Sequence, residues 1–159
     1  MAFTAQDVKA LREKTGVGMM ECKKALVEAD GDMDKAVDFL RERGLAAAAK
    51  KATRIAAEGV VLPYYDAEAK KGVVVEVNSE TDFVAKNEKF MSFVEGVAKT
   101  ILATNPADVE ALKEEKFDGT DRTVTETLND LVLSIGENMK VRRFERMDGI
   151  VSTLSLIHI

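Results

Sequence analysis

The sequence predicts an α+β fold with a helical N-terminal part and an α+β core. Up to residue 43, apolar residues recur at the three- and four-residue spacing of amphipathic helices. After Gly59, short β-branched runs replace this spacing and indicate strands. Hydrophobic residues (46%) and charged residues (32%) occur in proportions typical of folded chains. We expect a three-helix module over residues 1–44, an Ala/Lys-rich helical linker over 45–58, an α+β core subdomain with a small antiparallel sheet over 59–152, and a divergent, truncated tail over 153–159.

The first two helices are separated by a glycine-rich turn. Thr4 can cap the first helix, and Thr15-Gly16 can end it. The second helix is expected to begin near Met19. Its core stripe at helical spacing consists of Met19, Cys22, Leu26 and Ala29. This spacing leaves Met20 and Val27 on a different face of the helix.

A third helix and the linker follow Asp30-Gly31-Asp32, which can stop one helix and cap the next. The stripe of the third helix consists of Met33, Ala36, Val37 and Leu40. Gly44 is expected to end this helix. Residues 45–57 are rich in alanine and favour a helical linker. The linker carries three basic side chains and no acidic one up to residue 57, so a small RNA-binding patch remains an alternative.

The core is predicted to begin with an antiparallel hairpin. Its strands are Val60–Leu62 and Val73–Val77, joined by a polar turn. A long helix from about Val84 to Ala103 should follow, ended by Asn105-Pro106. The remaining expected elements are helices over Ala107–Lys116 and Thr123–Gly136, then strands over Met139–Ile159 with a turn at Asp148-Gly149.

The charge distribution argues against a nucleic-acid-binding protein. Residues 1–58 carry a net charge of +1 and residues 59–159 a net charge of −6, which together give −5. Binding to phosphate backbones requires a basic face, so DNA is not an expected partner and RNA is a minority hypothesis.

The location is predicted from three features of the sequence. The first nine residues lack a basic segment followed by an apolar core, no apolar run approaches the roughly 20 residues that span a bilayer, and the single cysteine cannot form an internal disulfide. We expect a soluble protein of the reducing cytoplasm with no membrane partner.

No constellation of residues supports catalysis. A nucleophilic pair would have to use Cys22, which lies on a core stripe, and His158, the penultimate residue. The paired ligand spacing of a zinc site is missing, and Gly16-Val17-Gly18 lacks the strand and the Gly-Lys-Ser/Thr of a phosphate loop. Carboxylates such as Glu76, Glu80 and Asp82 are expected to be solvated. We therefore predict no metal, no cofactor and no enzymatic activity.

Two segments are less well explained by packing alone. In Thr15–Leu26, Met20 lies off the core stripe and is suited to contact a partner. In Val77–Lys86, Phe83 lies between a strand and a helix. Spacing alone favours a capped helix with Phe83 continuing the apolar stripe of Phe90 into the core.

These two segments resemble signatures of bacterial translation elongation factor Ts. They are the Thr-Gly-Val-Gly-Met-Met-Glu-Cys-Lys-Lys-Ala-Leu run at 15–26 and the Thr-Asp-Phe-Val-Ala-Lys run at 81–86. The alanine and lysine linker and three further short runs are similar and follow the family's order: Glu76-Val77-Asn78, Ile135–Asn138 and Val141-Arg142-Arg143. The resemblance covers about residues 1–152.

The resemblance implies a guanine-nucleotide exchange factor for the GTPase elongation factor Tu in protein biosynthesis. Residues 1–44 would then be similar to a ubiquitin-associated domain that docks on the partner's nucleotide-binding domain. The implied docking residues are Arg12, Val17, Gly18, Met19 and Met20. The residues implied to disturb the partner's Mg²⁺ site are Thr81, Asp82, Phe83 and Val84. On this interpretation Phe83 is an exposed wedge, which outweighs its interpretation as a core residue.

The end of the chain departs from the family pattern. Residues 153–159 do not fit the segment that family members carry there, and those proteins continue further. This predicts a truncated product with reduced activity that lacks part of the partner surface and of any self-association surface. The alternatives are an RNA-binding protein and a small hydrolase, for which no convincing carboxylate is present. The RNA alternative would use Lys50, Lys51, Arg54, Arg142, Arg143 and Arg146.

Overall fold

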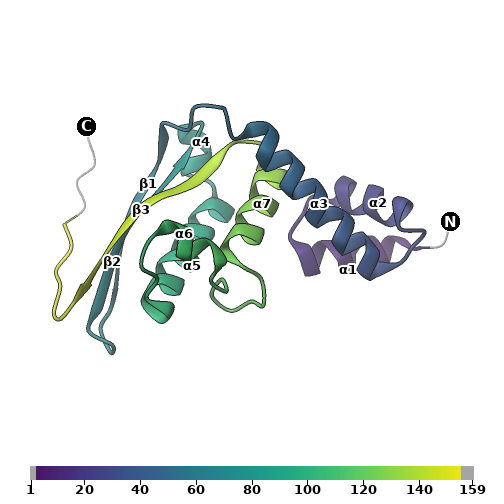
Figure 1. Cartoon of the computed structure of the whole chain (residues 1–159). Coiled ribbons are helices and arrows are strands. Elements are labelled where there is room, and N and C mark those ends of the chain that lie inside the picture. Colours follow the sequence, from purple (N-terminus) through teal and green to yellow (C-terminus); the bar gives the residue numbers. More distant parts are fainter. Residues whose placement is uncertain (1–2, 155–159) are drawn as a thin grey trace. The chain divides into compact units, whose positions relative to one another are not determined.

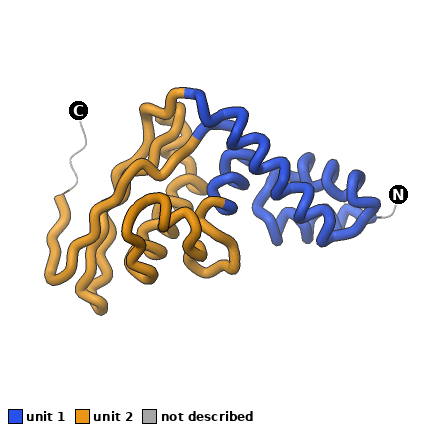
Figure 2. The backbone as a smooth tube through the Cα atoms, viewed as in Figure 1, with its two compact units in different colours: residues 1–54, 126–138 blue, residues 55–125, 139–159 orange. Residues whose placement is uncertain are grey.

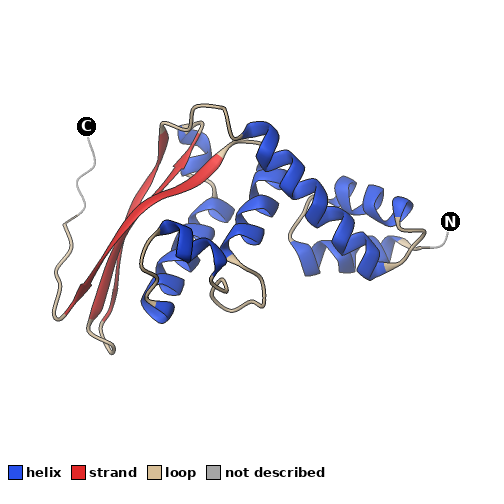
Figure 3. Cartoon of the chain, viewed as in Figure 1, coloured by secondary structure: helices blue, strands red, loops and turns tan. Residues whose placement is uncertain are grey.

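The computed structural model describes residues 3–154, which form seven helices and a three-stranded antiparallel sheet (Figure 3). The predicted α+β class is therefore confirmed. The chain divides into two compact units (Figure 2). Unit 1 contains residues 1–54 and 126–138, and unit 2 contains residues 55–125 and 139–159. None of the helices within residues 3–154 combines the length and apolar character needed to cross a bilayer.

Unit 1 begins with three helices, α1 (Ala5–Thr15), α2 (Met19–Glu28) and α3 (Met33–Lys51). Thr4 caps α1 in a capping box with Asp7, and Asp32 caps α3 by accepting the N–H groups of Asp34 and Lys35. Gly16 ends α1 with a φ of 70°, a conformation that glycine adopts without strain. The buried core of these helices consists of Val8, Leu11, Val17, Cys22, Ala25, Leu26, Ala29, Ala36 and Leu40.

The prediction that α3 ends at Gly44 is wrong, because this glycine is buried inside a helix that continues to Lys51. A Cβ at Gly44 would lie 3.4 Å from the Asp130 carboxylate and 3.5 Å from the Asn129 carbonyl oxygen. Both residues belong to α7 (Val124–Ile135), most of which lies in unit 1. The two helices therefore lie close together here, and a Cβ at Gly44 would be at ordinary contact distance from α7.

Unit 2 is built on the sheet, whose strand order is β1 (Glu58–Asp66), β2 (Lys71–Ser79), β3 (Met139–Asp148). The predicted hairpin is confirmed, with both strands longer than their apolar runs. Alternate residues of the central strand, Val73, Val75 and Val77, are at most 1% exposed. Helix α5 (Glu88–Thr104) packs against β1 and β2 and covers this face (Figure 1).

The predicted helix from Val84 to Ala103 is in fact two helices. A single turn, α4 (Asp82–Ala85), is followed by a break and then by α5. Asn87 lies in the break with extended backbone (φ −74°, ψ 131°), and its side chain accepts the N–H groups of Lys89 and Phe90. Since a polar cap satisfies the first free N–H groups of a helix, Asn87 starts α5 anew.

The remaining described parts are the short helix α6 (Val109–Glu114) and the segment that follows β3. The chain turns at Gly149, whose φ is 109° and whose N–H donates to the Lys70 carbonyl at 2.8 Å. Residues 149–154 do not form the further strand that was predicted, and residues 155–159 lie outside the described part.

Candidate partner-binding surfaces

The turn after β2 is held by hydrogen bonds among residues 79–84. The Thr81 hydroxyl caps α4 by accepting the Val84 N–H at 3.4 Å, and the Ser79 hydroxyl donates to the Thr81 carbonyl at 2.9 Å. Val84 is 7% exposed, so its side chain anchors the turn on the body of unit 2. Of the four residues expected here, Thr81 and Val84 thus hold the turn together.

Phe83 lies at the outside of this turn with 81% of its surface exposed, whereas Phe90 is fully buried. The alternative that Phe83 continues the core stripe of α5 is therefore wrong. The break at Asn87 separates the two phenylalanines into different helices. A large exposed aromatic ring on a held turn is a feature of contact surfaces.

Asp82 follows the cap and is also on the surface. Its carboxylate accepts a hydrogen bond from Lys86 Nζ at 3.1 Å, and the two side chains are 55% and 76% exposed. Such an exposed i, i+4 ion pair is worth little and is easily exchanged for another partner. The carboxylate is therefore available beside Phe83.

The start of α2 forms a second exposed apolar surface. Gly18 caps the helix without a side chain, and Met19 and Met20 are 42% and 65% exposed. Arg12, on α1, is also exposed. Val17 differs from the expectation, because its side chain is 1% exposed and packs in the core of unit 1. Val17 can position the turn, but its side chain is not offered to a partner.

Cys22 lies beneath this surface and is not a nucleophile candidate. Burial raises the pKa of its thiol, which lies 3.6 Å from the Val17 carbonyl. A buried thiol of raised pKa is inert. His158, its only conceivable partner in the sequence, lies outside the described residues.

The structure adds Val27 to the surface of α2. It is 52% exposed, and a shallow depression beside it is lined by Met20, Lys23, Lys24, Val27 and Glu28. The helical spacing had already placed Met20 and Val27 together on a face away from the core. No sequence signal, however, distinguished Val27 as a contact residue.

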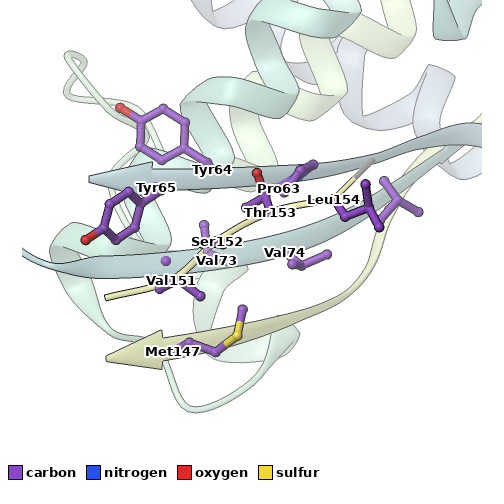
Figure 4. Close-up of a pocket in the computed structure, with 12 residues that line it drawn as sticks. Pro63, Tyr64, Tyr65, Val73, Val74, Met147, Val151, Ser152, Thr153 and Leu154 are labelled. Carbon is purple, nitrogen blue, oxygen red and sulfur yellow. The ribbon is translucent and has the colours of Figure 1, made fainter. Parts of the chain in front are cut away.

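A groove on the sheet was not predicted. It has a volume of about 300 Å³ and lies where residues 151–154 run along the strands (Figure 4). A Cβ on Gly72 would lie 3.0 Å from the Val151 side chain, so the glycine allows this close approach. Its lining includes Pro63, Tyr65, Val74, Met147 and Leu154. Sequence reasoning missed it because the groove depends on where residues 151–154 lie relative to the sheet.

Glu76 was expected to be solvated, but its side chain is only 11% exposed. It accepts hydrogen bonds from Arg143 at 2.7 Å, from Arg142 at 2.9 Å and from Asn78 at 3.3 Å. The Arg143 hydrogen bond, with help from Arg142 and Asn78, lowers the pKa of Glu76 against the opposing effect of burial. The cluster holds β2 and β3 together at the bulge between Glu76 and Val77.

Within residues 3–154, no group of three or more His, Cys, Asp or Glu side chains is arranged to hold a metal ion. The turn that carries Phe83 and the start of α2 expose aromatic, apolar and singly charged side chains. Such side chains are suited to contacts with another protein.

Comparisons with known proteins agree with the resemblance of the two signature segments. The family model described as "Elongation factor TS" matches residues 80–159, half of the chain. Elongation factor Ts of Clostridium perfringens strain 13 is 60% identical over 144 residues, covering 91% of this chain and 47% of the relative. Those of Syntrophotalea carbinolica and Clostridium botulinum strain Eklund 17B are 56% and 52% identical, covering 93% and 98% of this chain. The chain spans about half the length of these relatives. It belongs to the elongation factor Ts family.

Proposed function

We propose that this chain promotes the release of guanine nucleotide from elongation factor Tu during polypeptide elongation. The observation that carries the proposal is the exposure of Phe83, at 81%, on a turn whose neighbours are buried or hydrogen-bonded. Membership of the elongation factor Ts family is the reason for choosing elongation factor Tu as the partner. The function is exercised in the cytoplasm by binding, with no chemistry of its own and no DNA or membrane involved.

Exchange by binding requires a difference in affinity. A guanine nucleotide is held through its phosphates and Mg²⁺, so a factor that speeds its release must bind the nucleotide-free partner more tightly than the loaded one. Burying one phenylalanine ring contributes about 1.5–3 kcal/mol, and each ~1.4 kcal/mol changes a rate about tenfold. Phe83 alone therefore accounts for only part of a large acceleration.

The residues of the turn have different parts in this proposal. Phe83 inserts into an apolar pocket of the partner, while Thr81 and Val84 keep the turn in shape. The Asp82 carboxylate would compete for Mg²⁺ or repel phosphate, since a bound cation is the largest local charge at such a site. Lys86, its present ion-pair partner, would be displaced.

The surface of α2 supplies docking. Met19 and Met20 offer adaptable apolar contacts, and the exposed Arg12 of α1 and the Gly18 backbone before α2 offer polar ones. These contacts hold the partner in both its loaded and empty states, so they add affinity without adding selectivity for the empty state.

The experiment that tests the function is release of a fluorescent GDP analogue from purified elongation factor Tu, chased with excess GDP. The chain should accelerate release in a saturable manner. If release were unchanged at about 100 μM chain, a concentration that exceeds the dissociation constant of most specific complexes, the proposal would be wrong. A heat-unfolded sample of the same chain serves as the control.

A further inference from the structure

Ser79 occupies a fixed point at the end of the sheet. It is the last residue of the central strand, paired with Glu58 of β1 on one side and with Met139 of β3 on the other. Its side chain is fully buried, at 0% exposure. Since neighbours on both sides hold its backbone, the direction of its Cα–Cβ bond is set by the sheet.

That hydroxyl reaches into the turn that carries Phe83. Ser79 Oγ donates to the Thr81 carbonyl oxygen at 2.9 Å. The same carbonyl accepts the Ala85 N–H at 3.3 Å, and the Thr81 hydroxyl accepts the Val84 N–H at 3.4 Å. Thr81 is thus the residue at which the sheet and the first turn of α4 are joined.

Helix α4 needs this support. It has four residues, and one isolated helical turn is unfavourable because several dihedral angles are fixed for very few hydrogen bonds. Val84 contributes a buried side chain, but the ring of Phe83 is mostly in solvent. The direction in which Phe83 points therefore depends on how firmly the backbone of residues 81–85 is held.

We propose that Ser79 is a positioning residue for nucleotide exchange, whose buried hydroxyl holds the 81–85 turn in the shape that presents Phe83. This inference rests on the proposed function of Phe83. A turn ordered before binding loses less conformational freedom in the complex than a loose one, so the hydroxyl raises the rate without touching the partner.

The first test measures the turn in the chain alone. Amide hydrogen exchange is followed by NMR in the wild type, in Ser79→Ala and in Thr100→Val. Thr100 is the matched control, since its buried hydroxyl accepts the Asp118 N–H at 2.9 Å elsewhere in unit 2. The Val84 and Ala85 amides should exchange about tenfold faster in Ser79→Ala and be unchanged in Thr100→Val. Equal rates in the wild type and Ser79→Ala would overturn the proposal.

The second test measures GDP release from elongation factor Tu over a range of chain concentrations. Ser79→Ala should lower the maximal rate about five- to tenfold and shift the half-saturating concentration less than about twofold, because the α2 surface is intact. In a Phe83→Ala background, adding Ser79→Ala should change the rate little, since the turn then has no ring to position. If the fold decreases in GDP release caused by the two single substitutions multiplied in the double variant, the positioning role would be overturned.

The two tests also separate this inference from the proposed function. A wild-type chain that leaves GDP release unchanged would overturn the function, and the amide exchange rates would still decide whether Ser79 holds the turn. An active wild-type chain matched by Ser79→Ala would overturn only the role of Ser79. Ser79→Thr keeps the hydroxyl and should restore both the Val84 and Ala85 protection and the release rate.

Discussion

At the scale of single residues, the polar side chain of Asn87 explains why Phe83 is exposed while Phe90 is buried. They lie seven residues apart, which on one continuous helix places both on the same face. Asn87 interrupts that helix by capping a new one, and the two rings separate into an exposed one and a buried one. The apolar pattern is the same whether the helix is continuous or is interrupted at Asn87. The pattern alone therefore favoured the wrong interpretation, in which Phe83 lies in the core.

Phe83→Ala should slow catalysed GDP release about 10- to 100-fold, the equivalent of burying one ring at ~1.5–3 kcal/mol. Its effect on the free energy of unfolding should stay within about 0.5 kcal/mol, because the ring is 81% exposed. Stopped-flow release and urea unfolding measure the two effects. Ile55→Ala, at an equally exposed apolar residue of unit 2, should leave release unchanged. A large loss of stability in Phe83→Ala would contradict the exposed position.

Met20→Ala should raise the half-saturating concentration of the chain about three- to tenfold, because a partly buried apolar contact of about 1 kcal/mol is lost. The maximal release rate and the melting temperature should be nearly unchanged, since the side chain is 65% exposed. A titration of release rate against chain concentration separates the two quantities. Leu45→Ala, at an exposed residue of α3, is the control. A similar shift in both variants would argue against a specific surface on α2.

Glu76→Gln should destabilise the chain by about 1–2 kcal/mol at neutral pH, because charge-assisted hydrogen bonds from Arg142 and Arg143 are weakened. The pKa of Glu76 is lowered in the folded state, so its stabilisation is present above its unfolded pKa, near 4.5, and is lost as pH falls through the lower folded pKa. Urea unfolding from pH 7 to pH 3 should show the wild type and variant converging below about pH 4.5. A difference that stays constant over this range would contradict the role of the ionised carboxylate.

At the scale of elements, two glycines inside helices differ in the space that surrounds them. Gly44 in α3 faces the Asn129 and Asp130 region of α7, where a Cβ would find contacts of 3.4–3.5 Å. Gly96 in α5 faces Phe117, where a Cβ would come within 2.1 Å of the ring. That ring also stacks on Phe93, with centroids 5.5 Å apart. One site can therefore accept a methyl group and the other cannot.

Gly44→Ala should stabilise the chain by about 0.5–1 kcal/mol, because alanine loses less backbone entropy in a helix and its methyl group makes ordinary contacts. Gly96→Ala should destabilise it by about 1–3 kcal/mol, because Phe117 must move and its stacking on Phe93 is disturbed. Urea unfolding of the two variants side by side is the measurement. The same sign of change at both positions would contradict the packing described for one of them.

At the scale of the whole molecule, the net charge favours a protein partner over RNA. The chain carries a net charge of −5. Several of its arginines already have acidic neighbours, with Arg142 and Arg143 on Glu76 and Arg146 on Asp148. These arginines were the C-terminal part of the RNA alternative, and their carboxylate partners reduce the positive potential that RNA would meet.

The dissociation constant for a fluorescein-labelled RNA hairpin in about 150 mM salt should exceed about 100 μM, the weak end of non-specific binding by basic proteins. Fluorescence anisotropy over a salt series measures it. Tight binding with a steep salt dependence would revive the RNA alternative. Removing the basic end of the linker with Lys50→Ala and Lys51→Ala would then show whether the linker is responsible.

Residue spacing and short motifs within one stretch of chain were enough to predict the α+β class, the hairpin, the Thr4 and Asp32 caps and the family. Only the tertiary structure decided that Val17 is buried, that Gly44 lies inside a helix against α7, and that Ser79 is joined to the turn of Phe83. The first two depend on which residues distant in the sequence become neighbours, and local spacing does not record those neighbours. The third joins residues only two positions apart, and it depends on where the sheet directs the Ser79 side chain.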